Sequence, residues 1–167
     1  MTNVTVLAGD LSESKAHTLT NAVNTVGVMG KGIALGFKNR FPDMFHDYVR
    51  RCENGDVQVG RPYVYKGPTP PWVLNFPTKG HWRTPSRFDD ISNGLDHLIS
   101  HCRSWEIESI AVPALGCGAG GLDWLVVGPL LHQCLSQLEI PVELYAPSES
   151  AVAQLTELTI GPRNGQR

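Results

Sequence analysis

The chain has 167 residues, 41% of them hydrophobic and 18% charged, which suits one domain with one sizeable core. Its net charge of −2 excludes a positive field over the whole protein, so contact with nucleic acid would have to come from a local patch. No apolar run reaches the roughly 18–20 residues that span a bilayer, and the N-terminal residues lack the basic and apolar regions of a signal peptide.

The N-terminal half predicts, in order, two strands, two helices and two further strands: residues 4–8, 17–24, 33–40, 44–52, 61–66 and 72–77. The first two strands end in polar residues, at Asp10 and at the pair Asn21 and Asn24. The segment 27–32 is too rich in glycine for a helix interior, so the first helix should begin near Ile33.

The C-terminal half predicts a helix, a strand, a helix and a strand: residues 87–104, 109–115, 124–138 and 141–145. Ser86 is expected to cap the first of these helices, and Pro129 is expected in the first turn of the second. Residues 1–147 form the predicted domain. Residues 148–167 are expected to be poorly ordered or to begin a linker.

Strands that alternate with helices predict an α/β fold whose mostly parallel sheet is covered on both faces. Folds of this kind bind ligands at the carboxyl ends of their strands. Here those ends carry Asp10, Asn21, Asn24, Lys79 and the loop after Leu115. Because these residues converge on one edge of the sheet, the sequence predicts a binding site there.

Two glycine-rich loops, 27–32 and 116–121, each precede a predicted helix. Glycine lets backbone N–H groups approach an anion, and a helix N-terminus adds partial positive charge. A tight turn without a ligand is the alternative for the first loop, which lacks the Walker A pattern. The second loop satisfies G-x-G-x-x-G, but too little chain follows it for a Rossmann fold. Together the loops favour a diphosphate that backbone groups hold from both sides.

Single polar side chains near the loops offer contacts to a sugar or a base. Asn21 and Asn24 present the donors and acceptors that sugar hydroxyls need, although asparagine also caps turns. Asp10 could accept from an adenine amino group or cap the next helical turn, and the sequence leaves both interpretations open.

Lys79 ends an apolar strand and precedes a basic and aromatic cluster: His81, Trp82, Arg83 and Arg87. A lysine ammonium held against apolar walls loses solvation and can become a nucleophile, whereas most lysines are solvated at the surface. Arginine and histidine meet phosphates while tryptophan stacks on a base, so the cluster is a candidate nucleic-acid contact. A solvated loop with one anchoring tryptophan is the alternative.

Four segments together resemble the macrodomain superfamily: 9–11, 21–24, 26–34 and 113–122. The resemblance covers about residues 1–147 and implies a three-layer α/β/α fold with a central mixed, mostly parallel sheet. Residues 75–79 and 81–83 resemble DarG-type antitoxin macrodomains, which are DNA ADP-ribosyl glycohydrolases. That family removes ADP-ribose from thymidine bases in single-stranded DNA and so reverses the action of a DNA ADP-ribosyltransferase toxin. A non-catalytic ADP-ribose reader, or a hydrolase of ADP-ribosylated protein or acetylated ADP-ribose, stays open.

The resemblance also implies how the ligand is held. Asp10 and Leu11 would hold the adenine, and Asn21 and Asn24 would orient the distal ribose. The diphosphate would lie between two stretches of backbone: Gly30, Lys31, Gly32, Ile33 and Ala34 on one side, and Gly116, Cys117, Gly118, Ala119, Gly120, Gly121 and Leu122 on the other.

For catalysis, the resemblance implies that Lys79 attacks the anomeric carbon of the distal ribose beside Asn24. His81, or alternatively Asp123, would assist proton transfer, although Asp123 could instead cap the next helix. The implied contacts to the DNA strand are Trp82, Arg83 and Arg87.

The four cysteines are scattered, with no C-x-x-C pair, which predicts reduced thiols in a cytoplasmic protein: Cys52, Cys102, Cys117 and Cys134. No cluster has metal-ligand spacing, so we expect neither a metal nor a cofactor, with ADP-ribose as ligand and product. The expected partners are ADP-ribosylated single-stranded DNA and the cognate toxin, the latter through a C-terminal region that the relatives carry. We expect a monomer without membrane contact.

Overall fold

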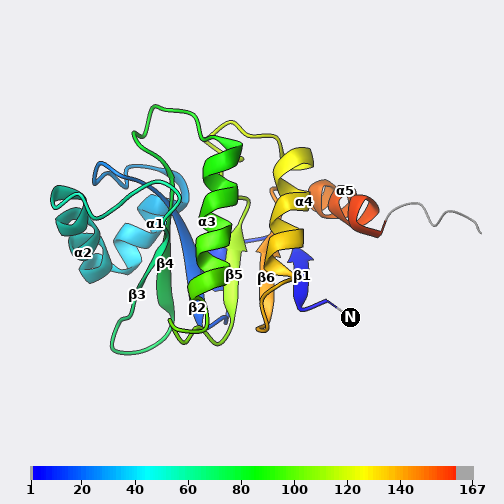
Figure 1. Ribbon diagram of the computed structural model, residues 1–167, viewed down its shortest axis with the longest axis horizontal. Coiled ribbons are helices and arrows are strands. Elements are labelled where there is room, and N and C mark those ends of the chain that lie inside the picture. The colour runs from blue at the N-terminus through cyan, green and yellow to red at the C-terminus, as the bar shows by residue number, and fades with distance from the viewer. Residues whose placement is uncertain (1, 161–167) are drawn as a thin grey trace, which may run out of the picture.

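A six-stranded sheet runs through the centre of the computed structural model, which describes residues 2–160 (Figure 1). The strands are β1 (Val4–Leu7), β2 (Thr18–Asn24), β3 (Tyr63–Tyr65), β4 (Trp72–Lys79), β5 (Ile110–Pro113) and β6 (Val142–Tyr145). The helices are the 3-10 turn η1 (Leu11–Glu13), α1 (Gly32–Arg40), α2 (Pro42–Glu53), α3 (Phe88–His101), α4 (Trp124–Leu135) and α5 (Glu149–Ile160). Every predicted strand and helix forms close to its predicted bounds.

The strands follow the order β1-β6-β5-β2-β4-β3. All neighbouring strands are parallel except β3, which pairs antiparallel with β4. The sheet is therefore mixed and mostly parallel, as predicted. Because parallel strands end at the same edge, the loops after β1, β2, β4 and β5 share one edge of the sheet. Figure 1 shows the loops after β4 and β5 above α3 and α4.

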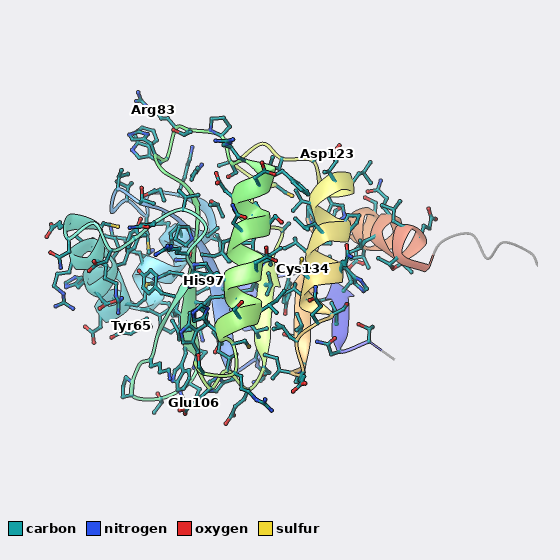
Figure 2. The ribbon with its side chains drawn as sticks, viewed as in Figure 1. Tyr65, Arg83, His97, Glu106, Asp123 and Cys134 are labelled. Carbon is teal, nitrogen blue, oxygen red and sulfur yellow. The ribbon has the colours of Figure 1, made fainter. Side chains whose placement is uncertain are left out.

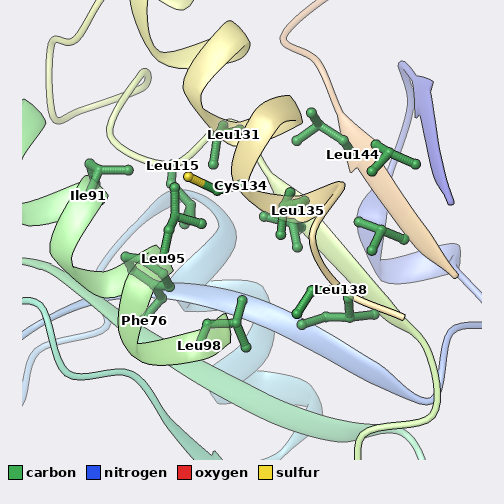
Figure 3. Packing of buried hydrophobic residues seen from close by; sticks show 14 of the residues in the cluster. Phe76, Ile91, Leu95, Leu98, Leu115, Leu131, Cys134, Leu135, Leu138 and Leu144 are labelled. Atoms are coloured by element: carbon green, nitrogen blue, oxygen red, sulfur yellow. The ribbon is translucent and has the colours of Figure 1, made fainter. Parts of the chain in front are cut away.

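Helices cover both faces of the sheet and enclose two hydrophobic cores. Alternation along β4 separates them: Val73 packs on the side of α1 and α2, whereas Leu74 and Phe76 pack on the side of α3, α4 and α5. Figure 3 shows the second of these cores, between the sheet, α3 and α4. Helix α3 approaches closely because Gly94 faces Phe76, whose Cζ would lie 2.3 Å from a Cβ at that glycine. The three-layer α/β/α prediction is confirmed.

Two roles predicted for residues at helix N-termini are wrong. Arg87, not Ser86, is the N-cap residue of α3, and its side chain makes no capping hydrogen bond to a described residue. The Ser86 N–H instead donates to the Gly120 carbonyl at 3.0 Å, which ties this residue to the second glycine loop. Pro129 lies inside α4 because that helix already begins at Trp124. The carbonyl that loses its donor belongs to the exposed Leu125, where water can satisfy it.

Residues 149–160 form a helix, whereas the sequence predicted a poorly ordered region or the beginning of a linker after residue 147. Ser148 Oγ accepts from the Ala151 N–H at 3.1 Å and so caps α5. Ala151 and Leu155 are buried in the same core as α4, and Nε1 of Trp124 donates to the Ala151 carbonyl at 3.0 Å. The sequence feature that indicates this helix is Ser148 followed by apolar residues four apart, Ala151 and Leu155. The rest of the expected extension, residues 161–167, lies outside the described part of the chain.

Candidate functional site

A cleft lies along the carboxyl edge of the sheet and consists of two adjoining cavities of about 930 and 490 Å³. We name its two ends after the residues that mark them, the Asp10 end and the Lys79 end. Both cavities are lined by the same five residues where they meet: Gly32, Ile33, Pro113, Ala114 and Gly118. Because these residues come from both glycine loops and from β5, the loops face each other across the middle of the cleft.

The first glycine loop delivers unpaired amides to the cleft. Helix α1 begins at Gly32, whose φ of +61° lies in the left-handed region that favours glycine. The first amide of α1 with a backbone acceptor is that of Leu35, which donates to the Lys31 carbonyl at 3.4 Å. The N–H groups of Gly32, Ile33 and Ala34 precede it and lack an intrahelical partner. These three residues line the cleft, as Gly30 and Lys31 do, and lie at the positive end of the helix dipole, which is a position that suits an anion.

The second glycine loop has the same property. Leu122 N–H donates to the Gly116 carbonyl at 2.9 Å, and this bond closes the loop. The amides of Gly118, Ala119 and Gly120 donate to no described residue, and all three residues line the cleft. Backbone donors therefore reach the cleft from both sides, which suits a diphosphate.

Not every predicted residue of the second loop reaches the cleft. Gly116 lines the Lys79 end and Cys117 lines the Asp10 end, whereas Gly121 and Leu122 line neither. Burial, and secondarily the charge of Asp123, raises the pKa of the Cys117 thiol to about 11. The thiol is therefore neutral at physiological pH, and Cys117 acts as a packing residue rather than a nucleophile.

Asp10 caps the short helix η1 and also lines the cleft. Its Oδ1 accepts from the N–H and the hydroxyl of Ser12 at 2.9 and 2.7 Å. These hydrogen bonds, and secondarily the charge of Arg40, lower the pKa of the Asp10 carboxyl. Arg40 Nη1 donates to the Ser12 carbonyl at 2.7 Å and so joins the end of α1 to η1 across the cleft. Leu11, which is buried, also lines this end.

Asn24 lines the Lys79 end, but its side chain is engaged in organising the loop that follows β2. Its Oδ1 accepts from the N–H groups of Val26 and Val28 at 3.1 and 3.4 Å, and its Nδ2 donates to the Val28 carbonyl at 2.7 Å. The buried Tyr48 hydroxyl lies 2.8 Å from both Oδ1 and the backbone carbonyl of Asn24. The turn-capping interpretation therefore holds for Asn24, which also contributes to the wall of the cleft.

Asn21 does not reach either cavity. It is fully buried on the α1 and α2 side of the sheet, where its Nδ2 donates to Asn75 Oδ1 at 3.2 Å. Asn75 in turn donates to the Tyr63 hydroxyl at 3.1 Å. The structure therefore gives no support to a ribose contact by Asn21.

A β-bulge brings Lys79 into the cleft. The pairing of β2 with β4 runs in register up to Val23 and Pro77 and then shifts, so that Asn24 pairs with Lys79 and Thr78 is the extra residue. Lys79 lines the cleft, and its Nζ donates to the Trp82 carbonyl at 3.2 Å. The sequence predicted a strand end here, but the shift in register became visible only in the folded sheet.

Of the basic and aromatic cluster, only Trp82 lines the Lys79 end. Trp82 lines the cleft and is 37% exposed, and the Arg83 guanidinium lies 4.4 Å from the centre of its ring. His81 stacks on Trp82 with a centroid distance of 5.0 Å, but it does not line either cavity. His81 Nδ1 accepts from the Arg83 N–H at 3.1 Å. Arg87 is exposed at the start of α3.

Asp123 does not reach the cleft either. Its carboxylate accepts from the Leu125 N–H at 2.9 Å and caps α4, as the alternative interpretation predicted. Figure 2 shows Arg83 and Asp123 at the same edge of the molecule but over different elements. Sequence reasoning missed three residues with a place in this site: Arg40, Tyr48 and Ser86, the last of which lines the Lys79 end.

Within residues 2–160, no group of three or more histidine, cysteine, aspartate or glutamate side chains is arranged to hold a metal ion. None of the helices in this same range combines the length and the apolar character needed to cross a bilayer. Beside the backbone of the two glycine loops, the cleft is lined by four charged residues: Asp10 and Arg40 at one end, and Lys31 and Lys79 at the other.

Comparison with known proteins matches residues 20–131 to the Macro domain family. The chain is 46% identical over 160 residues to the DNA ADP-ribosyl glycohydrolase of Thermus aquaticus, which covers 93% of this chain but only 44% of that relative. It superimposes on the macrodomain of Mycobacterium tuberculosis DarG with a TM-score of 0.83 and 45% identity, over 87% of this chain and 98% of the other. The structure of Thermosipho africanus DarTG in complex with ADP-ribose gives a TM-score of 0.84 and 42% identity, over 88% of this chain and 42% of the other. The chain belongs to the Macro domain family.

Proposed function

We propose that this macrodomain hydrolyses ADP-ribose from thymidine bases in single-stranded DNA and so reverses a DNA ADP-ribosyltransferase toxin. One observation supports the proposal: Lys79 and Asn24, which pair beyond the bulge at Thr78, both line the end of the cleft that Gly118, Ala119 and Gly120 also line. Relatives at 46% and 45% identity are DNA ADP-ribosyl glycohydrolases, although the chain spans less than half of their length.

In the pose we propose, the adenine lies at the Asp10 end, where the free Oδ2 of Asp10 would accept from its amino group. The diphosphate lies between the amides of Gly32–Ala34 and those of Gly118–Gly120. The distal ribose then reaches the Lys79 end. The order of these subsites follows the order of groups along ADP-ribose, the ligand in the structure of the Thermosipho africanus relative.

The chemistry needs the unprotonated amine of Lys79. Its lone pair attacks the anomeric carbon, the bond from that carbon to the thymine nitrogen breaks, and the proton leaving Nζ passes to the base. Water then attacks the same carbon, the carbon–Nζ bond breaks, and ADP-ribose leaves while Lys79 recovers its amine. We assign no proton transfer to His81 or Asp123, since neither lines the cleft.

The DNA strand would approach over Trp82, with Arg83 and Arg87 on its phosphates. This proposal is supported by the exposure of all three residues around the Lys79 end. The enzyme whose modification this domain would remove is a DNA ADP-ribosyltransferase. One relative, from Thermosipho africanus, carries a DNA ADP-ribosyltransferase and a glycohydrolase in the same chain. We propose that both act in the cytoplasm and that this domain works as a monomer without a cofactor.

The test is release of ADP-ribose from a single-stranded oligonucleotide that carries ADP-ribosylated thymidine. We expect Lys79→Ala to abolish release while calorimetry still shows binding of free ADP-ribose. Lys66→Ala is the matched control, because Lys66 lines neither cavity and its Nζ lies over the ring of Trp72 at 4.8 Å. Full activity of Lys79→Ala would show that the lysine mechanism is wrong.

The same assay separates the two other activities. A reader would bind ADP-ribose but show no turnover by the wild-type protein on any substrate. A hydrolase of another class would act faster on ADP-ribosylated protein or on acetylated ADP-ribose than on modified DNA. Either result would refute the proposed activity and leave the ADP-ribose pose intact.

A further inference from the structure

Ser86 carries a buried hydroxyl that the fold leaves unused. Three buried side-chain atoms find no hydrogen-bond partner among the described residues: Thr20 Oγ1, Asn21 Oδ1 and Ser86 Oγ. Of these, only Ser86 belongs to a residue that lines the cleft. Ser86 is 6% exposed and gives no cap to α3. Because buried polar groups are nearly always paired, an unpaired hydroxyl at a ligand site indicates a partner supplied by the ligand.

The position of Ser86 identifies which part of the cleft it serves. It lines the Lys79 end together with Lys79 and Trp82, and it does not line the Asp10 end. Its N–H donates to the Gly120 carbonyl at 3.0 Å, and a Cβ on Gly120 would lie only 2.3 Å from its Oγ. The hydroxyl therefore lies against the end of the second glycine loop, in the half of the cleft that the nucleophile occupies.

We infer that the Ser86 hydroxyl binds a hydroxyl of the distal ribose, an inference that rests on the proposed function. A serine hydroxyl donates one hydrogen bond and accepts others, which matches a sugar hydroxyl that does both. The bond between Ser86 N–H and Gly120 holds the backbone, while χ1 of serine has three staggered positions. Oγ can therefore turn from Gly120 toward the sugar without a change in the loop. Ser86 would thereby discriminate ADP-ribose from ADP, which lacks the distal ribose.

The test compares the affinities of Ser86→Ala for ADP-ribose and for ADP by calorimetry. We expect the affinity for ADP-ribose to fall about threefold to tenfold, the effect of one hydrogen bond, and the affinity for ADP to stay at the wild-type value. The melting temperature should not fall, because the unliganded protein loses no hydrogen bond. Ser100→Ala is the control, since the exposed Ser100 hydroxyl donates to the Asp96 carbonyl within α3 and should alter neither affinity.

Ser86→Cys provides a second variant of nearly the same volume with a weak donor, should the alanine variant fold poorly. Wild-type affinity for ADP-ribose in either folded variant would overturn the inference. An equal loss for ADP-ribose and ADP would also overturn it, because the hydroxyl would then act on the diphosphate or its loop. Failure of the wild-type protein to bind ADP-ribose would instead refute the proposed function itself.

Discussion

The hydroxyl of Tyr48 joins α2 to the loop after β2, and Tyr48→Phe removes it while keeping the ring. The residue is fully buried, and its Oη lies 2.8 Å from both the carbonyl oxygen and Oδ1 of Asn24. Oδ1 keeps the donors of Val26 and Val28, so the loss falls mainly on the carbonyl. A buried acceptor that loses its donor costs about 2 kcal/mol, which corresponds to a fall in melting temperature of about 4–8 °C in a domain of this size.

Urea unfolding followed by circular dichroism measures the change, with an unchanged slope against urea as the sign that the unfolded state is unaltered. Affinity for ADP-ribose should fall as well, because Asn24 and Val28 line the cleft. The matched control is Tyr65→Phe, because Tyr65 is half-buried and its hydroxyl makes no hydrogen bond to a described residue. Figure 2 labels Tyr65. Equal stability of Tyr48→Phe and Tyr65→Phe would refute the reasoning that the Asn24 loop depends on this hydrogen bond.

Three further predictions concern alkaline stability and the two sides of the cleft. Burial raises the pKa of the Tyr48 hydroxyl far above its usual value. Above a pH of about 10, the unfolded state therefore loses this proton while the folded state keeps it. The stability that the protonated hydroxyl contributes is complete below that pH and declines above it. Unfolding above that pH should show a decline in stability that is shallower in Tyr48→Phe by about 1.4 kcal/mol per pH unit. Gly120→Ala should weaken ADP-ribose binding and cost about 1–3 kcal/mol of stability, since the new methyl group would lie 2.6 Å from the Gly116 carbonyl oxygen. Gly118→Ala is the control and should fold with wild-type stability, because no atom lies within 4 Å of its new methyl group. Arg40→Ala should speed the dissociation of ADP-ribose in stopped-flow measurements, because it removes the hydrogen bond to Ser12 that joins the two sides of the Asp10 end. An unchanged dissociation rate would show that this hydrogen bond does not retain the ligand.

Local patterns were sufficient for the order of elements and for the two glycine loops. Hydrophobic periodicity is a property of neighbouring residues, and glycine before a helix indicates a loop wherever it occurs. The start of α1 beside Gly32 and the loop closed at Gly116 therefore agree with the sequence. The cap of α5 at Ser148 is also a local feature, which the expectation of a poorly ordered or linker segment from residue 148 overlooked.

Side-chain direction was harder to predict, because it depends on register and on distant neighbours. Asn21 and Asn24 look equivalent in the sequence, yet one belongs to the buried network with Asn75 and the other lines the cleft. His81 stacks on Trp82 instead of reaching the cleft. A polar residue can contact the ligand, a helix end or another buried group, and only packing chooses among these.

By itself, the sequence determined an α/β domain with two glycine-rich loops at one edge of a mostly parallel sheet, since strand, helix and glycine signals are local. Tertiary structure alone decided what those loops face. The order β5-β2-β4 brings together segments that are far apart in the chain, and the bulge at Thr78 turns Lys79 into the cleft. The tertiary structure also places the Ser86 hydroxyl against Gly120, where it makes no capping hydrogen bond to α3. These placements depend on strand pairing and close packing, which no local pattern encodes.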